Sequence, residues 1–457
     1  MPSTLPAGPY RTLSSPEGAT FPYYIIPFDK MGVCEGPQTR AHLLANLAGV
    51  TDVFVFSHGW NNDWSVASKR YEDFIKGFQA LRVKRMLSLP IPFEPLLVGV
   101  FWPSQALAWF DNETGPQFAG SGDGGASAAK DDAAASELHA SLRDMATELP
   151  AERRARFYEL SQATTLAKGE DQELASMLAS MLAGASDDEA GKASAPAPAD
   201  LLAAGASFET PEDDVDEIRV ATRGGAAGTP AAAGGFGFNL SVLDPRNLLK
   251  PFTVYQMKDR SGKIGANGVA PLLADILAKS DASARVHLIG HSFGCKVVMT
   301  AACVMPESAR PIESALLLQG AVSQYAFAAK VPERDVPGGF HSALSRVRQP
   351  ILATFSRYDD ALSKAFHLSV RRHDDLGELQ FAGNESPSKY GALGGFGPQD
   401  TKATFVQIND PGAPYDLAHA ERIVGVNGSR TISGHGDISN ESTWWAEYCL
   451  LMAHTTR

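Results

Sequence analysis

The sequence has few cysteines, and none of them stands in a pattern that binds metal or forms a short redox motif. Cys34, Cys295, Cys303 and Cys449 are the four present, without a Cys-x-x-Cys pair or the Cys/His spacing of a zinc site. A chain of 457 residues can stabilise itself by burying a core and does not depend on disulfides. We therefore expect reduced thiols in or near the core, and neither a metal nor a cofactor.

Long apolar runs and a basic leader are also absent. No stretch reaches the roughly 18 consecutive apolar residues that a membrane-spanning helix needs. The start of the chain lacks the basic-then-apolar layout of a signal peptide. With a hydrophobic content of 44%, we expect a soluble, cytoplasmic protein with no transmembrane segment.

Positive charge is scarce in one segment of the chain. The net charge is −12, but residues 113–240 carry 22 acidic against 9 basic residues, so the remainder has a net charge of +1. A net negative charge disfavours long-range attraction to nucleic acid or anionic lipid. We therefore expect no nucleic-acid partner, and we assign the acidity to this segment alone.

Outside residues 113–240, short apolar runs alternate with helical patterns. Strands separated by helices over this length predict an α/β fold with a doubly wound, mostly parallel sheet. The predicted strands are 23–28, 53–56, 96–102, 285–289, 315–318, 351–355, 404–408 and 422–426. The predicted helices are 38–47, 64–83, 269–277, 293–304, a segment ending at 366, and 442–452, the last anchored by Trp444 and Trp445.

Residues 113–240 interrupt this alternation and divide the predicted domain into 1–112 and 241–457. Glycine-rich stretches lie near both ends, and a Pro/Ala run occupies 195–200. Such composition buries too little apolar surface to offset the cost of ordering the backbone. In the middle, apolar residues recur at helical spacing over 138–149 and 174–182. We expect a large Ala/Gly-rich acidic insertion with flexible flanks around two or three amphipathic helices.

The sequence Gly-His-Ser-Phe-Gly at 290–294 lies directly between a predicted strand and a predicted helix. Gly-x-Ser-x-Gly alone is a weak signal, because chance supplies about 0.1–0.2 matches in a chain this long. The strand–turn–helix context is what a nucleophile elbow requires. In such a strained turn, a side chain at Gly290 or Gly294 would collide with backbone, and the helix N-terminus favours developing negative charge. Ser292 is therefore the predicted nucleophile; the alternative is a glycine-flanked turn without chemistry.

With this motif the chain resembles the α/β-hydrolase superfamily, which includes lipases, esterases, thioesterases and some serine peptidases. A second motif, Phe-Ser-His-Gly-Trp at 56–60, ends an early predicted strand. In the superfamily, a His-Gly turn at this place presents a backbone N–H to the oxyanion. The resemblance implies that the N–H groups of Trp60 and Phe293 form the oxyanion hole. Taken alone, His58-Gly59 reads equally well as an ordinary turn.

The resemblance also implies the chain order serine, acid, histidine. The acid should follow the next strand but one after the elbow. Residues 351–360 fit, with an apolar strand, a short polar turn and the doublet Asp359-Asp360. The turn length favours Asp359 over Asp360 as the acid, and one of the two can instead cap the next helix.

Among the histidines that follow Ser292, His435 alone lies in a glycine-flexed loop between a predicted strand and a predicted helix. The resemblance therefore implies His435 as the base. His454 lies close to the C-terminus, and His367 and His373 lie on or beside a predicted helix and are interpreted as surface residues. His287 and His291 are explained by packing or local hydrogen bonds. The other histidines that follow Ser292 are His341, His367, His373, His419 and His454.

The glycine-rich loop 391–397 lacks the Lys-Ser/Thr ending of a P-loop, so we predict a flexible loop.

These residues together predict a serine hydrolase that cleaves a carboxylic ester through an acyl-enzyme intermediate. The substrate is expected to be a small-molecule or lipid-like ester, the latter if the insertion forms a lid or cap over the site. The insertion has two other interpretations, a solvated segment and a docking element for a protein partner. Three alternatives remain for the chain: a peptidase or amidase of the same fold, a non-catalytic binding or scaffold protein, and a different enzyme such as a haloperoxidase or lyase.

Overall fold

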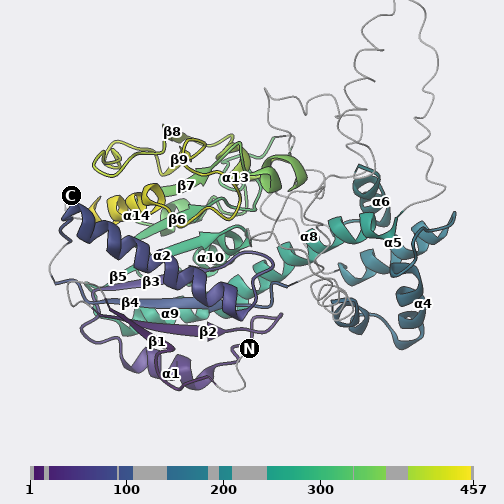
Figure 1. The fold of residues 1–457 in the computed structure, drawn as a ribbon, viewed down its shortest axis with the longest axis horizontal. Helices are drawn as coiled ribbons and strands as arrows, with labels where there is room; N and C mark the ends of the chain where they lie inside the picture. Colours follow the sequence, from purple (N-terminus) through teal and green to yellow (C-terminus); the bar gives the residue numbers. More distant parts are fainter. Residues whose placement is uncertain are drawn as a thin grey trace, which may run out of the picture.

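A nine-stranded sheet forms the centre of the protein (Figure 1). The computed structural model describes residues 5–14, 20–89, 92–105, 141–183, 195–207, 244–332, 334–366 and 390–453. The strand order is β1-β2-β4-β3-β5-β6-β7-β9-β8. The pairing of β1 with β2 is antiparallel, and the other pairings in the sheet are parallel. The prediction of an α/β fold with a mostly parallel sheet is confirmed.

Every strand predicted from an apolar run is present, with its ends shifted by a few residues at most. These strands are β2 (Thr20–Pro27), β3 (Asp52–Ser57), β4 (Pro95–Phe101), β5 (Arg285–His291), β6 (Ser314–Leu318), β7 (Ile351–Phe355), β8 (Ala403–Gln407) and β9 (Ile423–Asn427). The edge strand β1 (Arg11–Ser14) was not predicted, because it has only four residues and a single buried side chain.

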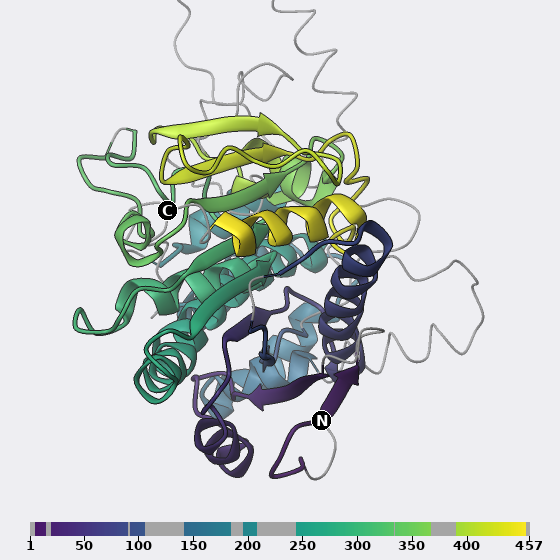
Figure 2. The same cartoon turned by 90° about the vertical axis from the view of Figure 1, so that its left-hand side faces the viewer.

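The sheet is covered on both faces, which is why its central strands read as continuous apolar runs. In β3, Val53 and Val55 join one core cluster while Phe54 and Phe56 join the other. Helices α2 and α14 contact each other on one side, and α9 and α10 lie on the opposite side (Figures 1 and 2). Predicted helices found close to their expected positions are α1 (Pro37–Ala45), α2 (Trp64–Arg85), α9 (Ala270–Lys279), α10 (Phe293–Val304) and α14 (Glu441–Ala453).

Helix α8 (Pro245–Lys263) was not predicted. It contains Pro251, which normally disfavours a helix interior, and its buried residues occupy every side rather than one stripe. Its position explains this pattern, because α8 packs against α10 of the sheet domain and against helices of the insertion. The π-helix η2 (Ile264–Val269) continues it into α9.

The described part of the insertion is helical and lies at the carboxyl edge of the sheet. Its elements are the helical residues 141–147, α4 (Ala151–Ser161), α5 (Glu170–Met181) and α6 (Pro198–Ser207). They gather around the start of α8 (Figure 1). Lys30, which follows β2, pairs with Glu148 at 3.2 Å, and Arg260 bonds the carbonyl of Pro103, which follows β4, and pairs with Asp144 at 3.6 Å.

Two predictions about disorder need correction. The Pro/Ala run at 195–200 leads into α6, whose Leu201 and Ala204 are buried against α8. The predicted flexible loop 391–397 contains the short helix α13 (Leu393–Phe396), with Gly394 packed against the backbone of Gln319. The glycine-rich flanks of the insertion, 120–125 and 224–235, lie outside the described residues.

The structure also describes the cysteines and the last helix. All four cysteines are free, with Cys295 and Cys449 buried. Trp445 is buried in the core cluster beneath α14. Within the described ranges, no helix is both long enough and apolar enough to cross a bilayer.

Candidate active site

Ser292 lies in a strained turn between β5 and α10. Its backbone has φ +56° and ψ −125°, a conformation that L-residues rarely adopt without tertiary support. The flanking glycines permit this turn. A Cβ on Gly290 would lie 2.7 Å from the Cα of Cys295, and a Cβ on Gly294 would lie 2.1 Å from the carbonyl oxygen of Ser57. The prediction that side chains at both positions would collide with backbone is confirmed.

The three predicted triad side chains lie in one hydrogen-bonded row. The Oγ of Ser292 is 2.8 Å from Nε2 of His435, and Nδ1 of His435 is 2.8 Å from Oδ2 of Asp359. An ionised carboxylate accepts only, so Nδ1 carries the proton and Nε2 accepts from the serine hydroxyl. Relative exposures are 1%, 6% and 0% for Ser292, His435 and Asp359. The row is therefore shielded from bulk water.

The structure separates the two members of the aspartate doublet. Asp359 is buried and reaches His435, whereas Asp360 is exposed. The second oxygen of Asp359 accepts from the backbone N–H of Leu362 at 3.1 Å, in the first turn of the π-helix η3 (Ala361–Ala365). The two roles considered for the doublet, histidine partner and helix cap, are thus combined in Asp359.

The turn after β3 lies directly against the serine. A Cβ on Gly59 would lie 2.6 Å from the Cβ of Ser292 and 3.1 Å from the carbonyl oxygen of His291. Trp60 and Phe293, the predicted oxyanion donors, flank this contact, and their rings meet edge to face at 6.3 Å. Phe293 is the first residue of α10, where backbone N–H groups have no acceptor within the helix.

This contact gives a first prediction. Gly59→Ala should lower the rate at which a serine-directed probe labels Ser292 by about 10²-fold, because the added methyl group must displace Ser292 from His435. The control is Gly8→Ala, whose Cβ would make only ordinary contacts with His42 at 3.7 Å. Labelling rates with a serine-directed probe and melting temperatures of both variants check it. Equal rates in Gly59→Ala and wild type would contradict it.

His58 supports the turn and does not take part in proton transfer in this arrangement. Its Nδ1 donates to the carbonyl of Gly59 at 2.8 Å, its Nε2 accepts from the N–H of Trp102, and its ring stacks on the Trp102 indole. Complete burial lowers the pKa of His58 to about 3. It is therefore neutral at physiological pH.

Three residues that sequence reasoning did not assign to the site hold the loop of His435. The carbonyl oxygen of His435 accepts from Nε2 of His291 at 2.8 Å and from the amide of Gln319 at 3.0 Å. The guanidinium of Arg70 in turn donates to Nδ1 of His291 at 3.1 Å. Gln319 follows β6 with a φ of +45°, so it shares with Ser292 a strained backbone at the carboxyl edge.

A second Ser–His–Asp row occurs at the opposite edge of the sheet. Nδ1 of His287 lies 2.7 Å from the hydroxyl of Ser314, and its Nε2 lies 3.1 Å from Asp52, which also pairs with Arg285 at 2.6 Å. The side chains of His287 and Asp52 are fully buried, and Ser314 lies in an ordinary strand. This row joins the starts of β3, β5 and β6 and lacks the strained turn of Ser292. It is a structural network.

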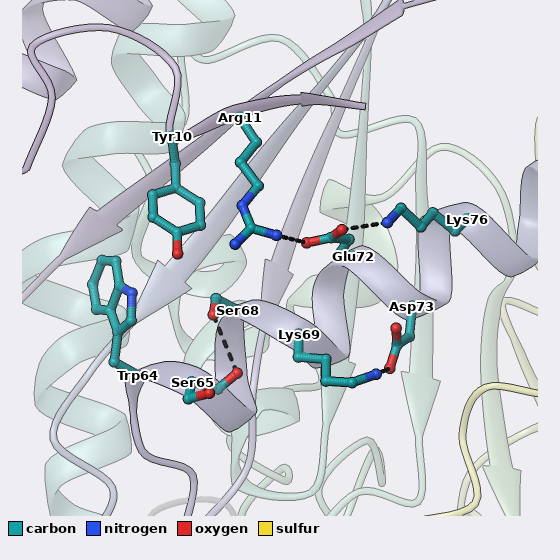
Figure 3. Close-up of a pocket in the computed structure, with 9 residues that line it drawn as sticks. All are labelled: Tyr10, Arg11, Trp64, Ser65, Ser68, Lys69, Glu72, Asp73 and Lys76. Atoms are coloured by element: carbon teal, nitrogen blue, oxygen red, sulfur yellow. Dashed lines mark hydrogen bonds and ion pairs between the residues drawn. The ribbon is translucent and has the colours of Figure 1, made fainter. Parts of the chain in front are cut away.

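Two cavities among the described residues are lined by side chains other than Ser292, His435 and Asp359. One, of about 880 Å³, is lined by residues adjacent in sequence to Asp359 and His435, among them Arg357, Tyr358 and Ser433. The other, of about 400 Å³, lies on the outer side of α2 (Figure 3). Its charged groups neutralise each other, as in the Arg11–Glu72–Lys76 and Lys69–Asp73 pairs. Nothing in the second cavity resembles a reactive centre.

The predicted alternatives to His435 do not reach Ser292 or lie outside the described residues. His341 contacts the carbonyl of Phe327, and His419 is an exposed partner of Asp416. His367, His373 and His454 are outside the described ranges. Within those ranges, no three His, Cys, Asp or Glu side chains are grouped as metal ligands.

Comparisons of the chain with protein-family models, with curated proteins and with solved structures found no match. An assignment of function therefore depends on the geometry of Ser292, His435 and Asp359.

Proposed function

We propose that this protein is a serine hydrolase of the α/β-hydrolase type that cleaves carboxylic esters. The observation that carries the proposal is the row Ser292–His435–Asp359, with both hydrogen bonds at 2.8 Å and the serine on a strained turn at a helix N-terminus. The chain order serine, aspartate, histidine agrees with the order that the resemblance implies.

The geometry supports acyl transfer in two steps. Ser292 Oγ attacks the ester carbonyl carbon while Nε2 of His435 takes the hydroxyl proton, and the same proton then passes to the departing alkoxide. A covalent acyl-serine remains. His435 next removes a proton from water, the resulting hydroxide attacks the acyl carbon, and the carboxylic acid leaves as Ser292 recovers its proton. Asp359 holds His435 in the Nδ1–H tautomer throughout.

The negative charge that develops on the carbonyl oxygen requires fixed donors. We assign this role to the backbone N–H groups of Trp60 and Phe293, because Gly59 touches Ser292 and Phe293 begins α10. Removing one such donor costs about 3 kcal/mol of transition-state stabilisation in related chemistry. Water exclusion by the buried site strengthens both interactions.

The substrate class follows from the surroundings of the site. The insertion helices lie at the sheet edge that carries Ser292, as a lid or cap requires, so we propose an ester with an extended or lipid-like acyl group. The acidic character of the insertion disfavours an anionic acyl chain of high charge.

The test is covalent labelling with a fluorophosphonate probe. We expect wild-type protein to be labelled and Ser292→Ala to resist labelling at an unchanged melting temperature. A panel of p-nitrophenyl esters of increasing acyl length, together with a matched anilide, then separates ester from amide cleavage. Well-folded wild-type protein that neither reacts with the probe nor cleaves any ester, even with residues 113–240 replaced by a short linker, would refute the proposal.

A further inference from the structure

We propose that Arg70 and His291 are positioning residues that hold the backbone of His435 so that its Nε2 faces Ser292. This inference rests on the proposed hydrolase function and adds two residues to its site. Arg70 lies on α2 and His291 ends β5, so the support reaches the loop of His435 from two separate elements.

The direction of each hydrogen bond follows from the chemistry of arginine. A guanidinium has donors only, so the nitrogen that it contacts, Nδ1 of His291, must be the acceptor. The proton of a neutral imidazole then lies on Nε2, which is the nitrogen 2.8 Å from the carbonyl oxygen of His435. Arg70 thereby fixes the one tautomer in which His291 donates to the backbone of His435.

His291 and His435 are buried, and Arg70 is partly buried beside them. His291 and His435 are 3% and 6% exposed, and their ring centroids lie 5.0 Å apart. Gln319 supplies the second donor to the same carbonyl oxygen and also binds the carbonyl of Gly434 at 2.7 Å. These contacts hold both peptide planes that flank the Cα of His435, so φ and ψ of His435 are restricted, and with them the direction of its Cα–Cβ bond.

Burial and, after it, the charge of Arg70 keep His291 neutral. The titratable and charged groups that face His291 are Arg70 from α2, His435 from the loop after β9 and His58 from the turn after β3. Burial, followed by the charges of Arg70 and His435, lowers the pKa of His291 well below 6.5. Protonating His291 would remove the acceptor at Nδ1 and place a second cation beside Arg70.

The experiment compares Arg70→Met and Arg70→Lys with Lys69→Met, a neighbouring exposed lysine whose partner is Asp73. In Arg70→Met, kcat should fall about tenfold, by analogy with other partners that fix a histidine tautomer, while KM stays unchanged. The acid limb of the kcat profile should move to higher pH, since the loss of the neighbouring cation raises the pKa of His291 while burial still lowers it. Arg70→Lys, which keeps a donor and a charge, should restore most of kcat, and Lys69→Met should behave as wild type.

A second pair of variants tests the donor itself. His291→Gln retains an amide donor and should keep more activity than His291→Leu, for which the expected loss of kcat is on the order of 10²-fold. Equal losses in the two variants would overturn the inference, as would identical kcat and pH profiles for Arg70→Met and Lys69→Met.

A readout that needs no substrate separates this inference from the proposed function. In protein labelled with ¹⁵N-histidine, His291 should show a protonated Nε2 and an unprotonated Nδ1, and in Arg70→Met the population of rings with a protonated Nδ1 should rise. A protonated Nδ1 in wild-type protein overturns the positioning role even if the protein is an active hydrolase. If His291 carries its proton on Nε2 but wild-type protein does not react with the fluorophosphonate probe, the proposed hydrolase function is refuted and the positioning role is not.

Discussion

Ser292→Ala and His435→Ala are each expected to lower kcat by about 10⁶-fold, and the double variant should be no worse than either single one. The reason is that the hydroxyl and the base 2.8 Å away act as a unit, so removing either one removes the nucleophile. Asp359→Asn should cost less, about 10⁴-fold, because it alters the tautomer of His435 without removing the base. Steady-state kinetics on the best ester from the acyl-length panel measure all four variants.

Asp360→Asn is the matched control for this series. Asp360 is adjacent in sequence to Asp359 but exposed, so its amide variant should retain wild-type kcat. The two aspartates therefore distinguish a contact with His435 from a general effect of charge near the site. A larger loss in Asp360→Asn than in Asp359→Asn, or multiplicative losses in the double variant, would contradict the proposed roles.

The parts of the fold that were predicted are those with a strong local signal. Strands buried on both faces, such as β3 and β5, read as continuous apolar runs, and α10 begins immediately after a glycine-flanked turn. The elements that were missed lack such a signal. Strand β1 is short and mostly exposed, and α8 is buried on all sides between two groups of helices, so neither shows a periodic apolar face.

The same distinction between strong and absent local signals applies to the residues of the candidate site. Ser292, Asp359 and His435 were found because each follows a predicted strand in a turn of recognisable composition, and the structure brings all three together. Their supporting residues were missed because the partners are remote in sequence. Arg70 and His291 are separated by 221 positions, and Gln319 and His435 by 116. A single sequence offers no local pattern for contacts that only the parallel sheet creates.

A buried carboxyl far from this site should make the protein less stable as the pH rises from 4.5 to 8. Glu447 lies on α14, is 1% exposed, and neither of its oxygens has a hydrogen-bond partner among the described residues. Burial, followed by the negative charge of Asp52, raises the pKa of Glu447 to about 8. Asp52 itself stays ionised, because although burial opposes this, His287, Arg285 and Thr51 lower its pKa below 3.8.

The sign of the effect follows from proton uptake in the two states. The folded protein keeps the proton of Glu447 up to about pH 8, whereas the unfolded chain releases it near 4.5. Between these values the unfolded state binds fewer protons, so the free energy of unfolding should fall by about 1.4 kcal/mol for each pH unit. This contribution is fully present below pH 4.5 and lost as the pH rises to 8.

Glu447→Gln should abolish this dependence, because the amide has the same shape and cannot ionise. We expect the variant to match wild type near pH 5 and to exceed it by a few kcal/mol at pH 8, measured as the urea midpoint at each pH. Glu441→Gln on the same helix is the control. Its carboxylate pairs with Lys84 at the surface, so its loss should change stability by less than about 1 kcal/mol. Urea midpoints of Glu447→Gln that run parallel to those of wild type from pH 5 to 8 would show that Glu447 ionises without cost, through a solvated or repacked α14.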